Sequence, residues 1–197
     1  MADSLAPSVV KPLLRGRFGQ PYRYAEITAS TQRMLSDDEG EGTIAVAEEQ
    51  TDGRGRLGRN WDAPAGTSLL VSVVLLPAVE AARLPELSLV AGRAVAEAIL
   101  EVTGVEPAIK FPNDVLIGGR KVAGILAESS EGRVVLGIGV NVNQTREQLP
   151  AGAQTEPTSL RLELGKPVNR VQLLAAVLLQ LERAYDAWVA TGTPGSG

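Results

Sequence analysis

Two residue types that often carry out catalysis or bind metals, His and Cys, are missing from this sequence. The 197-residue chain contains no His and no Cys. It therefore has no imidazole base, no thiolate nucleophile, no disulfide and no zinc site built from His and Cys. Any reaction must use carboxylates, Lys, Arg, hydroxyls, amides and backbone dipoles.

The most concentrated signal is a basic, glycine-rich loop at residues 51–66, TDGRGRLGRNWDAPAG. Arg54, Arg56 and Arg59 stand close together, and their guanidinium groups repel one another unless an anion lies among them. Glycines between them let backbone N–H groups approach a ligand, and each Arg offers a planar fork of donors. The loop alone is typical of a phosphate or carboxylate clamp, or equally of a solvated basic turn.

A second candidate is the segment KFPND at residues 110–114. Asn113 and Asp114 supply the amide and carboxylate oxygens that a magnesium–phosphate group prefers. The alternative interpretation is a strand end followed by an Asx-stabilised turn.

Two predicted strands add a cation and a bare surface. In residues 121–128, KVAGILAE, strand alternation places Lys121 on one face with Ala123, Ile125 and Ala127. In residues 133–143, RVVLGIGVNVN, the even positions are apolar and face the core. The odd positions end in Gly137, Gly139, Asn141 and Asn143. Two glycines on one strand face indicate a flat ligand or another backbone against it, or a bulge.

Hydrophobic periodicity predicts the elements that position these residues. Strands are expected at 43–50, 68–76, 108–111, 115–117, 122–128 and 133–142, and helices at 27–35, 87–102 and 171–188. Residues 51–66 and 144–158 are expected to be mobile loops that order over a ligand, because they hold few apolar anchors. The irregular interleaving favours an α+β fold, with a mixed, partly antiparallel sheet and helices on one side.

Composition excludes several classes of protein. Nineteen basic and 23 acidic residues give a formal charge of −4, which argues against broad nucleic-acid binding and predicts no DNA partner. No apolar run is long enough to cross a bilayer, and the N-terminus lacks the order of a signal peptide. A cytoplasmic protein without a membrane partner is the plain expectation.

Five segments, in this order, resemble biotin protein ligases, also called biotin–[acetyl-CoA-carboxylase] ligases. The resemblance runs from about Ser30 to Asn143. The segments that resemble the family are Ser30-Thr31-Gln32, then Glu49-Gln50-Thr51 leading into GRGRLGR and Trp61, then KFPNDV, GRKVAGILAE and GIGVNVN. The family's usual Trp before Pro-Asn-Asp is Phe111 here.

The resemblance implies a catalytic domain similar to class II aminoacyl-tRNA synthetases. Such a domain makes biotinyl-5′-AMP from biotin and MgATP, then passes the biotinyl group to a lysine of a biotin carboxyl carrier domain. By motif match, the catalytic residues are Arg56 and Lys121. The implied biotin-binding set is Ser30, Thr31, Gln32, Gln50, Gly53, Arg54, Gly55, Arg56, Lys121, Gly124 and Gly137. The implied nucleotide-binding set is Arg56, Asn113, Asp114, Lys121 and Asn141, with Asp114 as the Mg²⁺ ligand.

The resemblance also sets the expected domain organisation. Residues 1–24 are expected to be a loosely ordered lead-in, 25–190 the catalytic domain and 191–197 a flexible tail. The SH3-like C-terminal domain usual in the family is expected to be absent, and the lead-in is too short for a winged-helix repressor, so a monofunctional enzyme is expected. A homodimer is one assembly that the family allows. Two alternatives stay open: a lipoate ligase, which shares the fold and the lysine, and a protein that binds biotin without turning over ATP.

Overall fold

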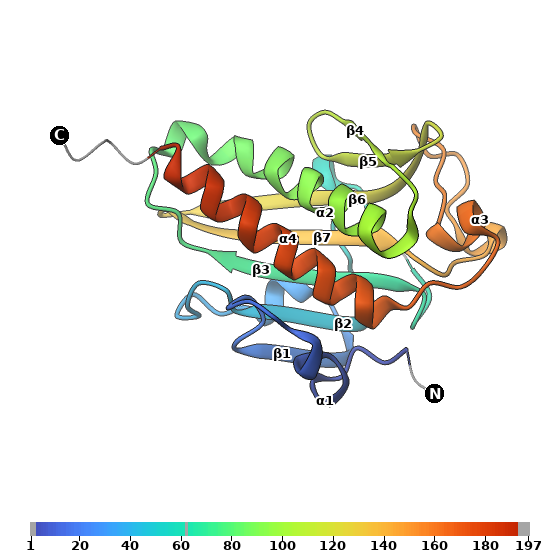
Figure 1. Ribbon diagram of the computed structural model, residues 1–197, viewed down its shortest axis with the longest axis horizontal. Helices are drawn as coiled ribbons and strands as arrows, with labels where there is room; N and C mark the ends of the chain where they lie inside the picture. Colours follow the sequence, from blue (N-terminus) through green and yellow to red (C-terminus); the bar gives the residue numbers. More distant parts are fainter. Residues whose placement is uncertain (1–2, 62, 193–197) are drawn as a thin grey trace.

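The computed structural model describes residues 3–61 and 63–192, and its centre is a seven-stranded sheet (Figure 1). The strands are β1 (Tyr22–Thr28), β2 (Ile44–Gln50), β3 (Ser68–Leu75), β4 (Ala108–Lys110), β5 (Asp114–Ile117), β6 (Arg120–Ser130) and β7 (Arg133–Asn141). Their order is β1-β2-β3-β7-β6-β5-β4. Only β1 and β2 pair in parallel; the other five neighbouring pairs are antiparallel. The predicted mixed sheet is confirmed.

Two long helices cover one face of this sheet (Figure 1). The α-helices are α1 (Pro7–Val10), α2 (Leu87–Thr103), α3 (Leu160–Leu164) and α4 (Arg170–Ala190). Short 3₁₀ turns are η1 (Lys11–Leu13), η2 (Thr31–Met34), η3 (Arg56–Gly58), η4 (Ala81–Glu86) and η5 (Arg146–Gln148). Helix α2 ends at Gly104, whose φ of 75° suits a residue without a side chain. The apolar stripes of α2 and α4 join the sheet in one buried core.

Strand β7 follows the predicted alternation and β6 does not. On β7, Val134, Leu136, Ile138 and Val140 are buried, as expected for the face under the helices. On β6, the pairing with β5 shifts register between Val115 and Leu116, so Val122 has no partner across that pair. This bulge turns Lys121 to the same face as Gly124, whereas Ala123 and Ile125 face the core opposite Val140 and Ile138.

The helix expected at 27–35 is wrong. Ile27 and Thr28 extend β1, because Thr28 pairs with Gln50 of β2, and only Thr31–Met34 form a 3₁₀ turn. Ser30 makes no side-chain cap. The N–H of Thr31 instead donates to Gln50 Oε1 at 2.8 Å. A side chain from the neighbouring strand thus holds this turn, which no local pattern encodes.

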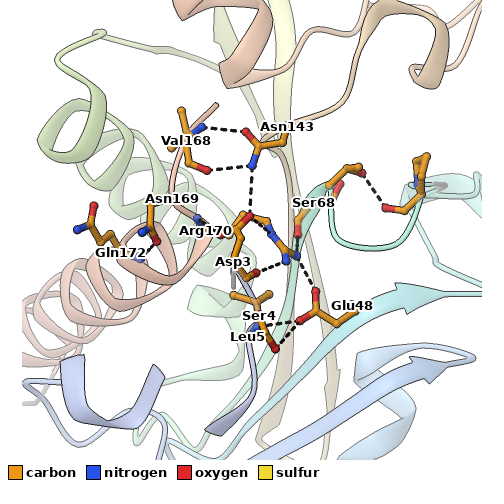
Figure 2. Close-up of polar contacts among 12 residues, drawn as sticks. Asp3, Ser4, Leu5, Glu48, Ser68, Asn143, Val168, Asn169, Arg170 and Gln172 are labelled. Carbon is orange, nitrogen blue, oxygen red and sulfur yellow. Dashed lines mark hydrogen bonds and ion pairs between the residues drawn. The ribbon is translucent and has the colours of Figure 1, made fainter. Parts of the chain in front are cut away.

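The N-terminal segment also differs from the expected loose lead-in. Leu5, Val10 and Phe18 are buried in the core. Figure 2 shows the polar anchor at its start, where the buried Arg170 of α4 contacts Asp3 through Nε at 2.7 Å and Glu48 of β2 through Nη1 at 2.8 Å. Two carboxylates around one guanidinium fasten the segment to the sheet and to α4.

The expected tail at 191–197 lies largely outside the described residues, which end at 192. Within the described part of the chain, no helix is both long and apolar enough to span a membrane.

Candidate active site

The face of the sheet away from α2 and α4 carries a buried cluster of hydroxyl and amide groups. Gln50, the last residue of β2, accepts hydrogen bonds from the N–H of Thr31 at 2.8 Å and from its hydroxyl at 3.1 Å. Because the hydroxyl proton of Thr31 is donated to Gln50, the hydroxyl of Ser72 donates to Thr31 Oγ1, with 2.7 Å between the two oxygens. This cluster, with the buried Ser30 beside it, forms a polar end to an inner cavity.

Bare glycines form the floor of that cavity, and side chains of this chain lie on them. A Cβ on Gly139 would lie 2.6 Å from Trp61 Cε2, and one on Gly124 would lie 3.0 Å from Trp61 Cζ3. A Cβ on Gly137 would meet Gln32 Cδ at 3.3 Å. Where a flat ligand or another backbone was expected, the indole of Trp61 thus lies against Gly124 and Gly139, and the side chain of Gln32 lies against Gly137.

The basic loop is fastened to the sheet at two of its arginines. Arg54 Nη2 lies 2.7 Å from a carboxylate oxygen of Glu128 on β6, and Arg56 Nη1 donates to Asn113 Oδ1 at 3.1 Å. Asn113 in turn donates from Nδ2 to the carbonyl of Ile125 at 3.1 Å. The loop thus lies over the cavity and is held by these two contacts, while Arg54, Arg56 and Arg59 all stay exposed.

Lys121 stands at the edge of the glycine floor. Its Nζ lies 2.7 Å from Asp114 Oδ1 and 5.6 Å from the centre of the Trp61 ring. The carboxylate and the ring face hold the ammonium group in place, while its side chain keeps 23% of its surface exposed. A fixed, partly exposed cation is suited to neutralising an anionic ligand.

Two adjoining cavities meet at this lysine. The inner cavity is much the smaller of the two. Five residues line both: Gly55, Arg56, Trp61, Asn113 and Lys121. A ligand group lying where the two cavities meet would contact the two cationic side chains of this shared wall, Arg56 and Lys121.

The outer cavity is cationic although the chain is acidic overall. Among the described residues, Arg56, Arg59, Lys110 and Lys121 line it against a single carboxylate, Asp114. Residues 150–157 close its other side. An excess of three positive charges suits a polyanion such as a triphosphate.

The loop at 144–158 is better anchored than its composition predicts. The backbone of Lys121 donates to the carbonyl of Glu156 at 2.7 Å and accepts from the N–H of Thr158 at 2.8 Å. Lys110 Nζ also donates to the hydroxyl of Thr155 at 2.8 Å. The mobility of this loop and of residues 51–66 stays a prediction.

The structure brings nearly all of the predicted site residues together. The inner cavity is lined by Ser30, Thr31, Gln32, Gln50, Arg54, Gly55, Arg56, Asn113, Lys121, Gly124 and Gly137, and the outer one also by Asp114 and Asn141. Gly53 lines neither cavity. A Cβ there would lie 2.3 Å from the carbonyl of Trp61, so its role is to let the loop fold back on itself.

Several lining residues were not predicted. Ser72 had a readable signal, since its hydroxyl interrupts the apolar run between Leu69 and Leu75 of β3. Trp61 stood in a quoted motif without a site role, and Gly139 was expected only as a bare position against a flat ligand, another backbone or a bulge. Residues 150–157 were expected only as part of a loop that orders over a ligand. They reach the cavity through the bridge between Pro157 and Lys121, a long-range contact that no local pattern predicts.

Comparison with known proteins is consistent with this geometry. Residues 24–144 match the model of the biotin/lipoate A/B protein ligase family. The chain belongs to this family. The match spans the five segments on which the sequence resemblance rested.

Relatives within the biotin/lipoate ligase family include two curated bacterial proteins. The bifunctional ligase/repressor BirA of Bacillus subtilis is 36% identical over 183 residues, covering 88% of this chain and 56% of that protein. The biotin–[acetyl-CoA-carboxylase] ligase of Mycobacterium tuberculosis is 37% identical over 202 residues, covering 94% of this chain and 74% of that protein. The chain thus spans little more than half the length of the Bacillus relative.

The fold of this chain is similar to that of the solved biotin protein ligase from Aquifex aeolicus in complex with biotin and ATP. That structure superposes with a TM-score of 0.78 at 35% identity, covering 86% of this chain and 72% of the Aquifex chain. The expected α+β ligase fold is confirmed.

Proposed function

We propose that this chain is the catalytic part of a biotin protein ligase, which activates biotin as biotinyl-5′-AMP and transfers the biotinyl group to a carrier lysine. The observation that carries the proposal is the position of Arg56 and Lys121 on the wall common to the two cavities. Joining an acid to a nucleotide requires positive charge at the point where the two substrates meet.

In the first step, a carboxylate oxygen of biotin attacks the α-phosphorus of ATP. A carboxyl–phosphate bond forms, the bond to the β-phosphate breaks, and pyrophosphate leaves. The acid is already ionised at neutral pH, so no base is required. Alignment and charge neutralisation suffice, which agrees with a chain without His or Cys.

The assignment of substrates to cavities follows from the lining of each cavity. The inner cavity combines the Thr31–Gln50–Ser72 cluster with the indole of Trp61, a lining suited to a ring that carries polar ureido groups beside apolar carbon and sulfur. The outer, cationic cavity suits ATP. The biotin carboxylate would then point toward Lys121.

Mg²⁺ fits the outer cavity as a companion of ATP rather than as a resident ion. Within the described residues, no three acidic side chains are grouped as a metal site. Asp114 offers one carboxylate, and the remaining ligands would come from phosphate oxygens and water, an arrangement Mg²⁺ commonly adopts. Bound there, Mg²⁺ supplies further neutralisation of phosphate charge.

In the second step, the lysine amine of a biotin carboxyl carrier domain attacks the carbonyl carbon of the adenylate, loses a proton, and displaces AMP. The outer cavity provides the approach, and Phe111 at its rim is 78% exposed. An exposed aromatic ring at the rim suits a protein partner that docks while its lysine enters.

Biotin-dependent exchange between ATP and pyrophosphate tests the proposal. We expect exchange with biotin and none above background with lipoate. Exchange that depends on lipoate would assign the chain to the other branch of the family. Biotin binding without exchange would identify a protein that binds biotin without activating it.

A further inference from the structure

A buried polar cluster lies behind the outer cavity, where β3 and β7 approach the start of α3. Its side chains belong to residues no more than 6% exposed, a high degree of burial for hydroxyl and amide groups. The members are Ser68, Asn141, Gln144, Thr158 and Ser159. Only Asn141 reaches the cavity lining, and the proposed reaction gives the other members no role.

A backbone carbonyl fixes the polarity of the cluster. Asn141 Nδ2 lies 3.0 Å from the carbonyl oxygen of Thr158, which can only accept, so the amide nitrogen must face it. Asn141 Oδ1 therefore faces Gln144, whose Nε2 donates to it at 3.0 Å. A reversed Gln144 amide would set two acceptors against each other.

Gln144 itself is held firmly. Its Nε2 also donates to Ser68 Oγ at 2.5 Å, and its backbone carbonyl accepts from Ser159 Oγ at 2.7 Å. The carbonyl of Ser68 is fixed in turn by Arg170 Nη1 at 3.0 Å, as Figure 2 shows. Gln144 Oε1 is buried and has no partner among the described residues, so its two donated bonds alone orient the amide.

The same cluster leads to Lys121. Thr158 accepts from Asn141 through its carbonyl and donates from its N–H to the carbonyl of Lys121 at 2.8 Å. The N–H of Lys121 donates to the carbonyl of Glu156 at 2.7 Å. A displaced Asn141 amide would therefore disturb both the cavity wall and the backbone that carries the lysine.

We propose that Gln144 is a positioning residue for the nucleotide half of the reaction. It holds the Asn141 amide in one orientation toward the phosphates of a nucleoside triphosphate and keeps residues 156–158 paired with Lys121. This inference rests on the proposed function, because it takes ATP as the occupant of the outer cavity.

Gln144→Met tests the inference, since Met has a similar size and cannot donate a hydrogen bond. Calorimetry should show ATP affinity reduced about tenfold, the effect of one lost hydrogen bond. The exchange assay should show a raised KM for ATP. Biotin affinity should stay within about twofold of the wild type, because the Thr31–Gln50–Ser72 cluster is untouched.

Ser159→Ala is the matched control. It removes the hydrogen bond that Ser159 Oγ donates to the backbone carbonyl of Gln144 and the cap that Ser159 Oγ provides to the N–H of Leu162 at the start of α3. Neither bond involves the Gln144 side-chain amide. Its ATP affinity should equal that of the wild type, even if its melting temperature falls. A purely structural role of the cluster predicts instead that both variants lose stability and affinity together, and that result would overturn the inference.

Gln144→Glu provides a second, opposite test. A carboxylate cannot donate to Asn141 Oδ1 and repels it, so ATP affinity should fall further than in Gln144→Met. Unchanged ATP affinity in both Gln144 variants would overturn the inference. Calorimetry needs no turnover, so a wild-type chain that binds ATP without exchange would refute the proposed function alone, and one that binds no ATP would refute both.

Discussion

Lys121 and Arg56 are the residues whose charge the proposed reaction depends on most. Both lie at the junction of the cavities, where the carboxylate of biotin would meet the α-phosphate of ATP. Replacing either with Ala should reduce adenylate formation roughly 100-fold or more, because a charge-assisted contact in a closed site is lost. Pyrophosphate exchange measures the effect, and Lys166→Ala, which removes an exposed cation between α3 and α4, is the control. Near-normal exchange in both variants would contradict the mechanism.

Thr31 tests the polar end of the inner cavity. Thr31→Val keeps the shape of the side chain but removes the hydroxyl that joins Gln50 to Ser72. Biotin affinity should fall about tenfold, since buried polar groups are left without partners. Thr43→Val is the control, because the Thr43 hydroxyl is buried and makes no hydrogen bond within the described residues. Calorimetric titration with biotin distinguishes the two variants, and equal affinities would refute this role.

At the scale of elements, strands β6 and β7 contribute glycines, Gly124 and Gly139, whose missing side chains leave room for the indole of Trp61. Gly139→Ala would place a methyl group 2.6 Å from the indole of Trp61, too close for the ring to stay where it is. We expect a folded protein with altered Trp61 fluorescence and biotin affinity lowered about tenfold or more, the scale of an overpacked site. Gly40→Ala, where the added Cβ meets nothing within 4 Å, is the control. Unchanged fluorescence and affinity would show that the glycine floor is dispensable.

The docking of the N-terminal segment on α4 predicts a pH dependence of stability. Arg17 makes two hydrogen bonds to the carboxylate of Asp186, at 2.6 and 2.8 Å, and these hold the pKa of Asp186 below its ordinary value. Because the pKa is lower in the folded state, the ion pair stabilises the protein at pH values above about 3.9, the ordinary pKa of an Asp side chain. This stabilisation is lost as the pH falls through the lowered pKa.

Asp186→Asn should therefore lower the free energy of unfolding by about 0.5 kcal/mol at pH 7, a modest amount because both side chains are about half exposed. The difference from the wild type should shrink toward zero in strongly acidic solution. Urea denaturation over a series of pH values measures it. A constant difference at every pH would show that the ion pair is not its source.

At the scale of the whole molecule, the sheet brings together groups that are far apart in the sequence. Ser30 and Asn141 are separated by most of the chain, yet they line adjoining cavities on one face. The opposite face is closed by α2 and α4 (Figure 1). A molecule with a net charge of −4 thus presents a local cationic surface at the outer cavity.

The periodic elements were predictable because their patterns are local. The alternation of β7 and the stripes of α2 and α4 are written in consecutive residues, and the structure confirms them. The motifs also located most of the cavity lining. The turn at Thr31–Met34, the bulge at Val122 and the anchoring of residues 156–158 depend on partners elsewhere in the chain, and no local pattern predicts them.

The central claim, that a carboxylate oxygen of biotin attacks the α-phosphorus of ATP at this site, is tested most directly by isotope transfer. The protein is incubated with carboxyl-¹⁸O biotin and MgATP, and the product is then released with an amine such as hydroxylamine. The oxygen that bridges carbon and phosphorus stays with phosphorus when the amine attacks the carbonyl carbon. The account predicts AMP that carries ¹⁸O, together with unlabelled pyrophosphate. Unlabelled AMP, or label in pyrophosphate, would contradict it.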